Sequence, residues 1–501
     1  MKISILAHRI LSIAVRAAAP IWAALLLLVV AGCSNSAPPA NNPTPAPGPA
    51  LTPILATVLP ATPAPGLPTP AATTLTVAPA TPAPTGGNPV DWPTYHGDLR
   101  RTGYVANMPD PRQLKTAWNV PLDGAVYAQP LVIGGHMVAV TEGDSLYSLN
   151  AATGQTEWRT NIGQPVPRSS LPCGNIDPLG ITGTSVYDPA SGLVFAVAEV
   201  SGPAHVLVGL DLKTGAVRVR RSVDPQGMNP LAHQQRAGLT LWQGYVYIAF
   251  GGLYGDCGDY HGWVVASRTD GTGALLSYQV PTGREGGIWA AAGPTIDASG
   301  NLYVSVGNGS EVAGNWDKSD SVLRFLPSLQ LQDGFAPDQW RQDNLADADL
   351  GSLSPALLPN RLIFIAGKAG IAYLLHADAL GGIGGQVQAT SLCHAYGGAA
   401  VVGSMLFVPC NEGVQQVQIS AGPSLSPGWR ASGVPGSPVV GGHTVYSLDR
   451  GGTLHALDIN TGKDRATLPV GATTRFATPA LYGNQIFVGT MAGVVAVTLT
   501  Q

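Results

Sequence analysis

A seven-residue stretch, Ser148-Leu149-Asn150-Ala151-Ala152-Thr153-Gly154, recurs along the chain and decides the fold. It returns as Gly209-Leu210-Asp211-Leu212-Lys213-Thr214-Gly215 and as Ala456-Leu457-Asp458-Ile459-Asn460-Thr461-Gly462. In each copy an apolar strand runs into a tight turn. There the Asp or Asn can accept hydrogen bonds from turn amides, and the Gly can adopt a positive φ. The stretch therefore predicts repeated strand–turn–strand units.

Similar sequence surrounds each copy. Small residues and a Pro precede a short apolar strand and a Gly turn at 128–135, 436–442 and 477–483, and a second strand follows at 137–140, 444–448 and 485–488. A fourth strand is clearest at 155–158. Eight such units begin near residues 128, 181, 235, 290, 351, 397, 436 and 477. Four strands per unit, repeated radially, predict a β-propeller.

The last unit stops at Gln501 after about three strands, whereas strand-like sequence at 114–122, including Trp118, precedes the first unit. Pairing these two segments would close the ring and remove the exposed sheet edges. We therefore predict an all-β chain with a single eight-bladed β-propeller, whose N-terminal strand closes the last blade. Two smaller propellers are the alternative, but no linker-like segment interrupts residues 91–501.

Composition supports this interpretation. Of 501 residues only 11% are charged, and 63 are Gly and 43 Pro, which argues against a helical or coiled-coil protein. The 26 Lys and Arg against 30 Asp and Glu give a net charge of −4. Because this balance has no basic excess, we expect no nucleic-acid partner.

The N-terminus has the features of an export signal. Lys2, Arg9 and Arg16 precede a mostly apolar run at 17–32 that ends in Ala-Gly before Cys33, which resembles the bacterial lipoprotein box. We expect residues 1–32 to be a lipoprotein signal peptide and Cys33 to carry lipid, with a signal anchor or transmembrane helix as the alternative. The protein would then be exported and anchored by lipid to the cell membrane or the outer membrane.

The following segment, 33–90, is expected to be a disordered tether after the lipidated cysteine. Residues 34–90 contain no Lys, Arg, Asp or Glu and are rich in Pro, Ala and Thr, so they cannot bury a core. An O-glycosylated stalk is the alternative. The propeller, 91–501, would lie outside the cytoplasm and is expected to be a monomer.

Four cysteines remain after lipidation, and an even number in an exported chain suggests two disulfides. Three pairings exist in principle. Cys393–Cys410 looks local, across neighbouring strands of the sixth unit, and Cys173–Cys257 would then join loops of the second and third units. Zinc is the less favoured alternative, because no CxxC pair is present.

The repeated units resemble the PQQ-repeat propellers, a superfamily that includes quinoprotein alcohol dehydrogenases and the lipoprotein scaffold of outer-membrane protein assembly. The resemblance covers about 92–501 and is specific for fold rather than function, because the same propeller serves catalysis and scaffolding.

Some motifs resemble the dehydrogenases in particular. By this resemblance, Trp289 in Gly286-Gly287-Ile288-Trp289 would lie under the quinone, and Asn308 of the Gly-Asn-Gly turn would bind a metal. Lys368 would touch the quinone oxygens, Glu199 would be a second metal ligand, and Asp349 would be the catalytic base.

The chemistry implied by this resemblance is consistent. Calcium prefers oxygen ligands such as Glu199 and the Asn308 amide, and a flat quinone stacks on an indole. Lys368 could polarise a quinone carbonyl, and Asp349 could accept the alcohol proton. Each residue also has an ordinary structural interpretation, such as core packing for Trp289 or a turn position for Lys368.

Two departures weaken the enzymatic interpretation. The sequence contains neither the adjacent cysteines that cover the quinone in the large alcohol dehydrogenases nor a haem-binding CxxCH motif. The stretch 255–263 is a separate motif that contains Asp256, Asp259 and His261. These residues either line the central opening or belong to a disulfide-pinned loop. We therefore expect first an envelope binding or scaffold module with a protein partner. The alternative is a PQQ- and calcium-dependent dehydrogenase acting on a small alcohol or sugar.

Overall fold

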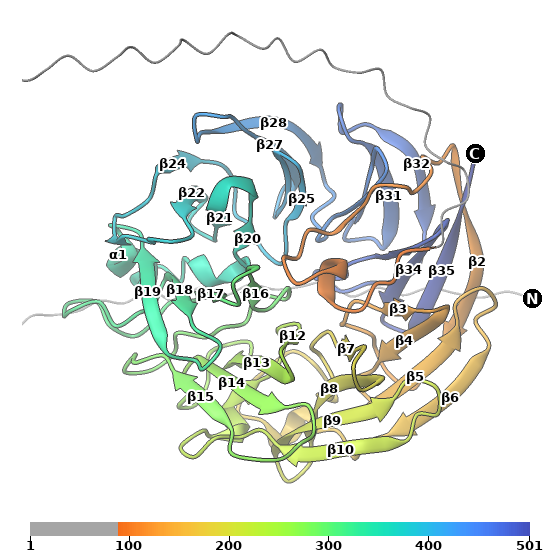
Figure 1. Cartoon of the computed structure of the whole chain (residues 1–501), viewed down its shortest axis with the longest axis horizontal. Helices are drawn as coiled ribbons and strands as arrows, with labels where there is room; N and C mark the ends of the chain where they lie inside the picture. Colours follow the sequence, from red (N-terminus) through yellow and green to blue (C-terminus); the bar gives the residue numbers. More distant parts are fainter. Residues whose placement is uncertain (1–88) are drawn as a thin grey trace, which may run out of the picture. The chain divides into compact units, whose positions relative to one another are not determined.

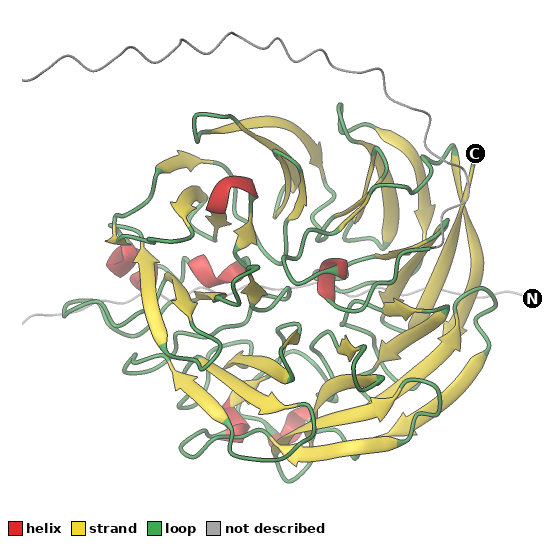
Figure 2. Cartoon of the chain, viewed as in Figure 1, coloured by secondary structure: helices red, strands yellow, loops and turns green. Residues whose placement is uncertain are grey.

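The structure is a computed structural model that describes residues 89–501. The signal peptide, Cys33 and nearly all of the tether lie outside the described residues, so these expectations stay predictions. The described part consists of eight β-sheets arranged around a centre, and almost all of its regular structure is strand (Figure 1, Figure 2). The predicted all-β, eight-bladed propeller is confirmed.

The first four blades follow the chain in order. Blade one contains β3 (Leu131–Ile133), β4 (His136–Val140), β5 (Ser145–Asn150) and β6 (Thr156–Asn161). Blade two contains β7 (Val186–Asp188), β8 (Leu193–Val200), β9 (Ala204–Asp211) and β10 (Val217–Ser222). Blade three contains β11 (His233–Gln234), β12 (Thr240–Trp242), β13 (Tyr245–Gly252), β14 (Trp263–Arg268) and β15 (Leu276–Gln279). Blade four contains β16 (Thr295–Ile296), β17 (Leu302–Val306), β18 (Ser321–Phe325), β19 (Leu331–Ala336) and β23 (Gly382–Ile383).

The other four blades include two strands from the N-terminal part. Blade five contains β20 (Ala356–Leu357), β21 (Leu362–Ala366), β22 (Ile371–His376) and β24 (Gln388–Ser391). Blade six contains β25 (Ala400–Val402), β26 (Met405–Cys410), β27 (Gly413–Ile419) and β28 (Leu425–Ser432). Blade seven contains β29 (Val439–Gly441), β30 (Thr444–Leu448), β31 (Thr453–Asp458), β32 (Asp464–Pro469) and β1 (Tyr104–Val105). Blade eight contains β33 (Ala480–Tyr482), β34 (Gln485–Thr490), β35 (Gly493–Thr500) and β2 (Gln113–Pro121).

Helices are short throughout the described residues. They are α1 (Trp340–Leu345) and the 3₁₀ turns η1 (Tyr95–Gly97), η2 (Arg168–Ser170), η3 (Pro230–Ala232), η4 (Leu350–Ser352) and η5 (Pro359–Arg361). Within residues 89–501, no helix has the length and apolar character needed to span a membrane.

The repeated turn does what its sequence predicts. The Asp211 carboxylate accepts hydrogen bonds from the amides of Lys213 and Thr214, and Gly215 adopts a φ of 70°. Asn150 and Asp458 accept the equivalent bonds in blades one and seven.

The turn also joins neighbouring blades. Trp158, on the outer strand of blade one, packs against Gly215 of blade two and donates its indole N–H to the Leu212 carbonyl at 2.8 Å. A β-carbon on Gly215 would lie 2.6 Å from the indole, so the turn needs glycine for space as well as for φ. The same indole-to-carbonyl hydrogen bond links Trp118 to Ala151 and Trp429 to Ile459.

Closure of the ring follows the prediction. Strand β2 pairs antiparallel with β35, with Trp118 opposite Ala496, and forms the outer strand of blade eight. The ring is therefore held by hydrogen bonds between the N-terminal and C-terminal parts of the propeller. The parallel pairing of β1 with β29, the first strand of blade seven, was not evident from the sequence.

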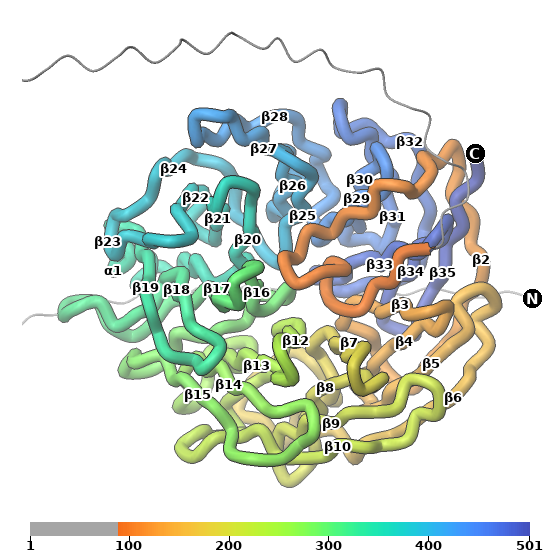
Figure 3. Tube along the Cα trace, viewed as in Figure 1, coloured from red at the N-terminus to blue at the C-terminus, as the bar shows by residue number. Residues whose placement is uncertain are grey.

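Residues 92–103 run through the middle of the ring (Figure 3). Their hydrogen bonds reach all eight blades in turn, through Val132, Tyr187, Leu239, Ile296, Leu357, Val401, Val440 and Thr478. Arg101 is 2% exposed and donates to the carbonyls of Leu239 (2.9 Å) and Tyr95 (3.1 Å). This central segment is a partly buried hub that connects the blades.

Both predicted disulfides are present. Cys410 ends β26 of blade six, but Cys393 follows β24 of blade five, so the bond joins two blades and not two strands of the sixth unit; the Cα atoms are 5.7 Å apart. Cys173 and Cys257 join the loops of blades two and three, with Cα atoms 5.9 Å apart.

Candidate functional site

A cavity of about 750 Å³ lies where the loops of several blades meet. Its wall is rich in aromatic and charged side chains. The aromatic ones are Tyr127, Tyr254, Tyr260, Trp289, Tyr396 and Phe476, and the charged ones are Arg236, Asp256, Asp347, Asp349, Lys368 and Arg475. Such a cavity is large enough for a small organic ligand and has a few converging polar groups.

Three residues predicted from the sequence meet in this cavity. Trp289, which precedes β16, lies on the wall, and the Nζ of Lys368 is 5.7 Å from the centre of its ring. Lys368, in the turn between β21 and β22, pairs with Asp349 at 2.6 Å and with Asp347 at 2.7 Å. The sequence stretches around these residues are far apart in the chain, so their convergence is a property of the fold.

Asp349 is held firmly at the cavity wall. Its side chain is buried, and its Oδ1 accepts the backbone N–H of Asn308 at 2.6 Å while its Oδ2 faces Lys368. Burial raises the pKa of Asp349, although Lys368 and the Asn308 amide oppose this effect. Burial lowers the pKa of Lys368, but the attraction of Asp349 and Asp347 more than compensates, and the net effect raises it.

The backbone of the Gly-Asn-Gly stretch, 307–309, contacts the Asp349 carboxylate and donates a hydrogen bond to it. A β-carbon on Gly307 would lie 2.2 Å from the Asp349 Oδ1, so only glycine leaves room for this carboxylate. The Asn308 side chain donates instead to Glu285 at 3.3 Å and does not line the cavity. Asn308 is thus next to the site, but its amide is directed elsewhere.

Glu199, the other predicted metal ligand, has its own hydrogen-bond partners. At the end of β8 its carboxylate accepts the Gln235 amide at 2.8 Å and lies 3.8 Å from the His205 ring nitrogen. It does not line the cavity and shares no hydrogen bond with Asn308. No hydrogen bond within residues 89–501 joins Glu199 to Asn308, and their shared calcium site stays a prediction.

Glu199 belongs instead to a group of buried acids. Glu142 accepts hydrogen bonds from the Gly180 amide and the Thr182 hydroxyl. Neither carboxylate oxygen of the fully buried Asp144 has a hydrogen-bond partner among the described residues. Burial raises the pKa of Glu142 and of Asp144 to about 8 and that of Glu199 to about 7.

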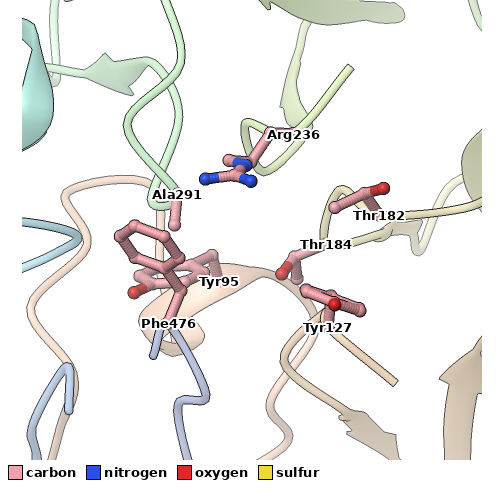
Figure 4. A pocket seen from close by; sticks show the side chains of 7 residues that line it. All are labelled: Tyr95, Tyr127, Thr182, Thr184, Arg236, Ala291 and Phe476. Carbon is pink, nitrogen blue, oxygen red and sulfur yellow. The ribbon is translucent and has the colours of Figure 1, made fainter. Parts of the chain in front are cut away.

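Two cavity arginines were missed by the sequence analysis. Arg236 follows β11 and has its guanidinium carbon 5.0 Å from the Phe476 ring centre. It also borders a smaller adjoining pocket with Tyr95, Tyr127 and Phe476 (Figure 4). Arg475 stacks on Tyr396 at 3.6 Å. No repeat position marks either residue, because their convergence depends on loops of blades three and eight.

The loop around Cys257 is pinned by a disulfide, and one of its three singled-out residues also lines the cavity. Asp256 lines the cavity and accepts the Tyr260 hydroxyl at 2.6 Å, and the Cys173–Cys257 disulfide pins the loop. The Asp259 side chain is 81% exposed, and neither it nor His261 lines the cavity.

Comparison with known proteins identifies sequences and structures that are similar to this chain. The sequence model of the family described as outer membrane protein assembly factor BamB matches residues 110–254. The solved quinohemoprotein alcohol dehydrogenase ADHIIG from Pseudomonas putida HK5 is similar with a TM-score of 0.64 at 14% identity, over 82% of this chain and 80% of that one. Residues 110–254 are thus similar in sequence to that family, and the eight-bladed propeller is similar in fold to the dehydrogenase. No curated protein sequence matches it.

Two further structures show how broadly this fold is used. A europium-containing methanol dehydrogenase gives a TM-score of 0.65 at 14% identity, over 82% of this chain and 98% of that one. BamB from Moraxella catarrhalis gives 0.54 at 15% identity, over 77% and 100%. At these identities the likeness concerns the fold alone. The two disulfides indicate an extracytoplasmic location.

Proposed function

We propose that this propeller is an extracytoplasmic oxidoreductase that binds PQQ, or a closely related planar quinone, in its central cavity. The observation that carries the proposal is the convergence of Trp289, Asp349 and Lys368 on one cavity of about 750 Å³. These residues match quinoprotein motifs in the sequence, and they line the same cavity.

The residues fit such a group. The Trp289 indole offers a flat apolar surface for a fused ring. The Lys368 ammonium lies over the face of this indole, 5.7 Å from the ring centre. When bound, PQQ would supply the capacity to accept two electrons from an alcohol. The predicted calcium receives no such support, since Glu199 accepts the Gln235 amide and the Asn308 side chain donates to Glu285.

Asp349 would accept the proton of the substrate hydroxyl at its carboxylate. A raised pKa brings a carboxylate closer to the value of an effective base at neutral pH. Lys368, held by Asp347 as well as Asp349, keeps a positive charge at the wall and stabilises negative charge that develops beside it. The small alcohol or sugar substrate would enter through the same cavity.

Dye-linked activity tests this function. The purified full chain, incubated with PQQ in the presence and absence of calcium, is expected to reduce an artificial electron acceptor when primary alcohols or aldose sugars are added. Asp349→Asn should lose at least about 100-fold in turnover while still binding PQQ, because a positioned base contributes about that factor or more.

The matched control is Asp259→Asn, which changes an exposed carboxylate outside the cavity. Activity without any PQQ dependence, or equal turnover in Asp349→Asn and the wild type, would contradict the proposal.

We further propose that lipid at Cys33 anchors the protein to a membrane. This proposal rests on the sequence around the cysteine, since residues 1–88 are outside the described structure. In a bacterial expression host, the wild type should fractionate with membranes, and Cys33→Ser should be released into the soluble envelope fraction. Equal membrane association of both would argue against the anchor.

A second candidate function is an envelope scaffold, which the BamB-family match over residues 110–254 favours. A membrane-envelope pull-down with the full chain should then recover a protein partner whose binding depends on the propeller and survives Trp289→Leu. Recovery of the same proteins by the tether alone would count against the scaffold.

A further inference from the structure

A third side chain that can bind metal lies beside the Cys393–Cys410 disulfide. The two sulfur atoms and one carboxylate oxygen of Glu412 all lie within 4.8 Å of one another. Cys393 is 6% exposed and Cys410 1%, whereas the Glu412 side chain is 38% exposed, so an ion could enter from solvent. The group lies where blades five and six meet, and none of its members lines the central cavity.

One oxygen of the Glu412 carboxylate is unsatisfied in this position. Its Oε1 pairs with the His394 Nδ1 at 2.8 Å. Its Oε2 is closed to solvent and has no hydrogen-bond partner among the described residues. A buried carboxylate oxygen without a partner is costly, and a disulfide has no proton to donate to it. A cation bound at this oxygen would remove the cost.

The backbone holds the three side chains together. Ala395 and Cys410 form a β-bridge, and the Asn411 N–H donates to the His394 carbonyl at 2.8 Å. The Cα atoms of the two cysteines are 5.7 Å apart. Because zinc–sulfur bonds are about 2.3 Å long, two thiolates on such close Cα atoms can share one ion.

We propose that, once this disulfide is reduced, Cys393, Cys410 and Glu412 bind a zinc ion or a similar thiophilic divalent cation. A dithiol reductant supplies two electrons and two protons, so the S–S bond breaks and the reductant becomes a disulfide. The ion then displaces one proton from each thiol as two metal–sulfur bonds form. Two thiolates, one carboxylate and a water complete the four ligands that zinc prefers. The inference does not depend on the proposed quinone function.

The bound ion would preserve the link between the two blades. Cys393 lies in a segment whose Leu392 and Ala395 amides donate to carbonyls of the turn between β21 and β22, at 2.8 and 3.1 Å. That turn contains Lys368. A metal link in place of the disulfide would therefore keep the segment beside this turn under reducing conditions.

Cobalt(II) is the probe for the site, because its thiolate complexes absorb visible light. The full chain is reduced with dithiothreitol, freed of it in the absence of oxygen, and titrated with cobalt(II) and then with zinc. The reduced wild type should show thiolate–cobalt absorption that saturates at a single ion per chain and disappears when zinc is added. The oxidised chain should show none.

Variants separate this site from ordinary dithiol binding. Cys393→Ser/Cys410→Ser should lose the absorption, because the described structure places no third ligand within the same reach of the other disulfide. Glu412→Gln should weaken zinc binding at least about 10-fold, the loss that follows even when a residue only orients a metal ligand. The matched control is Asp259→Asn, an exposed acid two residues from Cys257, which should leave zinc affinity unchanged.

Thermal melts keep the test decisive if reduction weakens the fold. Zinc should raise the Tm of the reduced wild type and leave the oxidised chain and Cys393→Ser/Cys410→Ser unchanged, because an ion that binds only the folded state stabilises it. A reduced wild type that takes up no more cobalt than this double variant, or whose Tm zinc does not raise, would overturn the proposal. Equal zinc affinity in the reduced wild type and Glu412→Gln would overturn it as well, since the cysteines would then bind as a simple dithiol.

Discussion

At the scale of single residues, the Lys368–Asp349 pair determines the pH below which the proposed reaction slows, because Asp349 must be ionised to accept a proton. Lys368 lowers the pKa of Asp349 against the larger effect of burial. Lys368→Met should therefore move the acidic limb of the pH–rate profile to higher pH, because the base loses its nearest stabilising charge. Profiles of kcat for the wild type and the variant would measure this shift.

The control for this prediction is Lys213→Met, which removes an exposed ammonium in the turn of blade two. Its profile should match the wild type. An acidic limb that stays in place in Lys368→Met would show that another group titrates.

The buried Asp144 carboxyl group is expected to make the stability of the fold depend on pH. Its folded pKa of about 8 lies far above the ordinary value of 3.8, because burial and the charges of Glu199 and Glu142 oppose ionisation. Between these two values the folded state holds a proton that the unfolded chain has released, so the free energy of unfolding falls as pH rises. Asp144→Asn should make this fall shallower, giving a Tm roughly 1–3 °C above the wild type at pH 8.5.

Thermal melts from pH 6 to pH 9 would measure the effect, with the exposed Asp259→Asn as a control that leaves the curve unchanged. Parallel curves for the wild type and Asp144→Asn would contradict the raised pKa.

At the scale of elements, the contact between Trp158 and Gly215 predicts how blades are joined. Gly215 and Gly192 have nearly the same φ, 70° and 72°, but an added β-carbon meets the indole at Gly215 and nothing within 4 Å at Gly192. Both alanine variants lose about 1 kcal/mol for the left-handed backbone. Gly215→Ala should lose at least about 2 kcal/mol more, because it displaces a buried indole.

Urea denaturation of the two variants isolates the blade contact from the backbone penalty. Equal losses of stability at Gly215 and Gly192 would mean that the indole does not hold the blades together.

The central segment gives a second prediction at this scale. Arg101 is buried and donates to carbonyls from its own segment and from blade three. Arg101→Met should lower the free energy of unfolding by about 3 kcal/mol, because several carbonyls lose their donor. Arg112→Met, on the surface, should change it by less than about 0.5 kcal/mol, and a similar loss in both would refute the role of the hub.

The sequence was most informative about these elements. Strand positions, the Asp-x-x-Thr-Gly turns and the pairing of 114–122 with the last blade follow from alternation and local turn chemistry, which act over a few residues. The sequence did not reveal β1 or the central segment, because both depend on contacts between distant parts of the chain. Glu199 illustrates the same limit: its partner, the Gln235 amide, belongs to the next blade and is not evident from the sequence.

At the scale of the whole molecule, the closed ring explains why the site exists. The cavity is made from loops of separate blades, and these blades are joined into one ring by β2 in blade eight and by the hydrogen bonds of residues 92–103. Trp289, Asp349 and Lys368 were predictable by motif, whereas Arg236 and Arg475 became visible only once the ring placed them beside Phe476.

A crystal structure of the protein grown with PQQ is the most direct test of this account. We expect one PQQ molecule in the central cavity, with its ring on the Trp289 side and its quinone oxygens within reach of Lys368. A cavity that contains only water in well-diffracting crystals at saturating PQQ, or a PQQ molecule bound solely on the outer surface, would contradict the central claim.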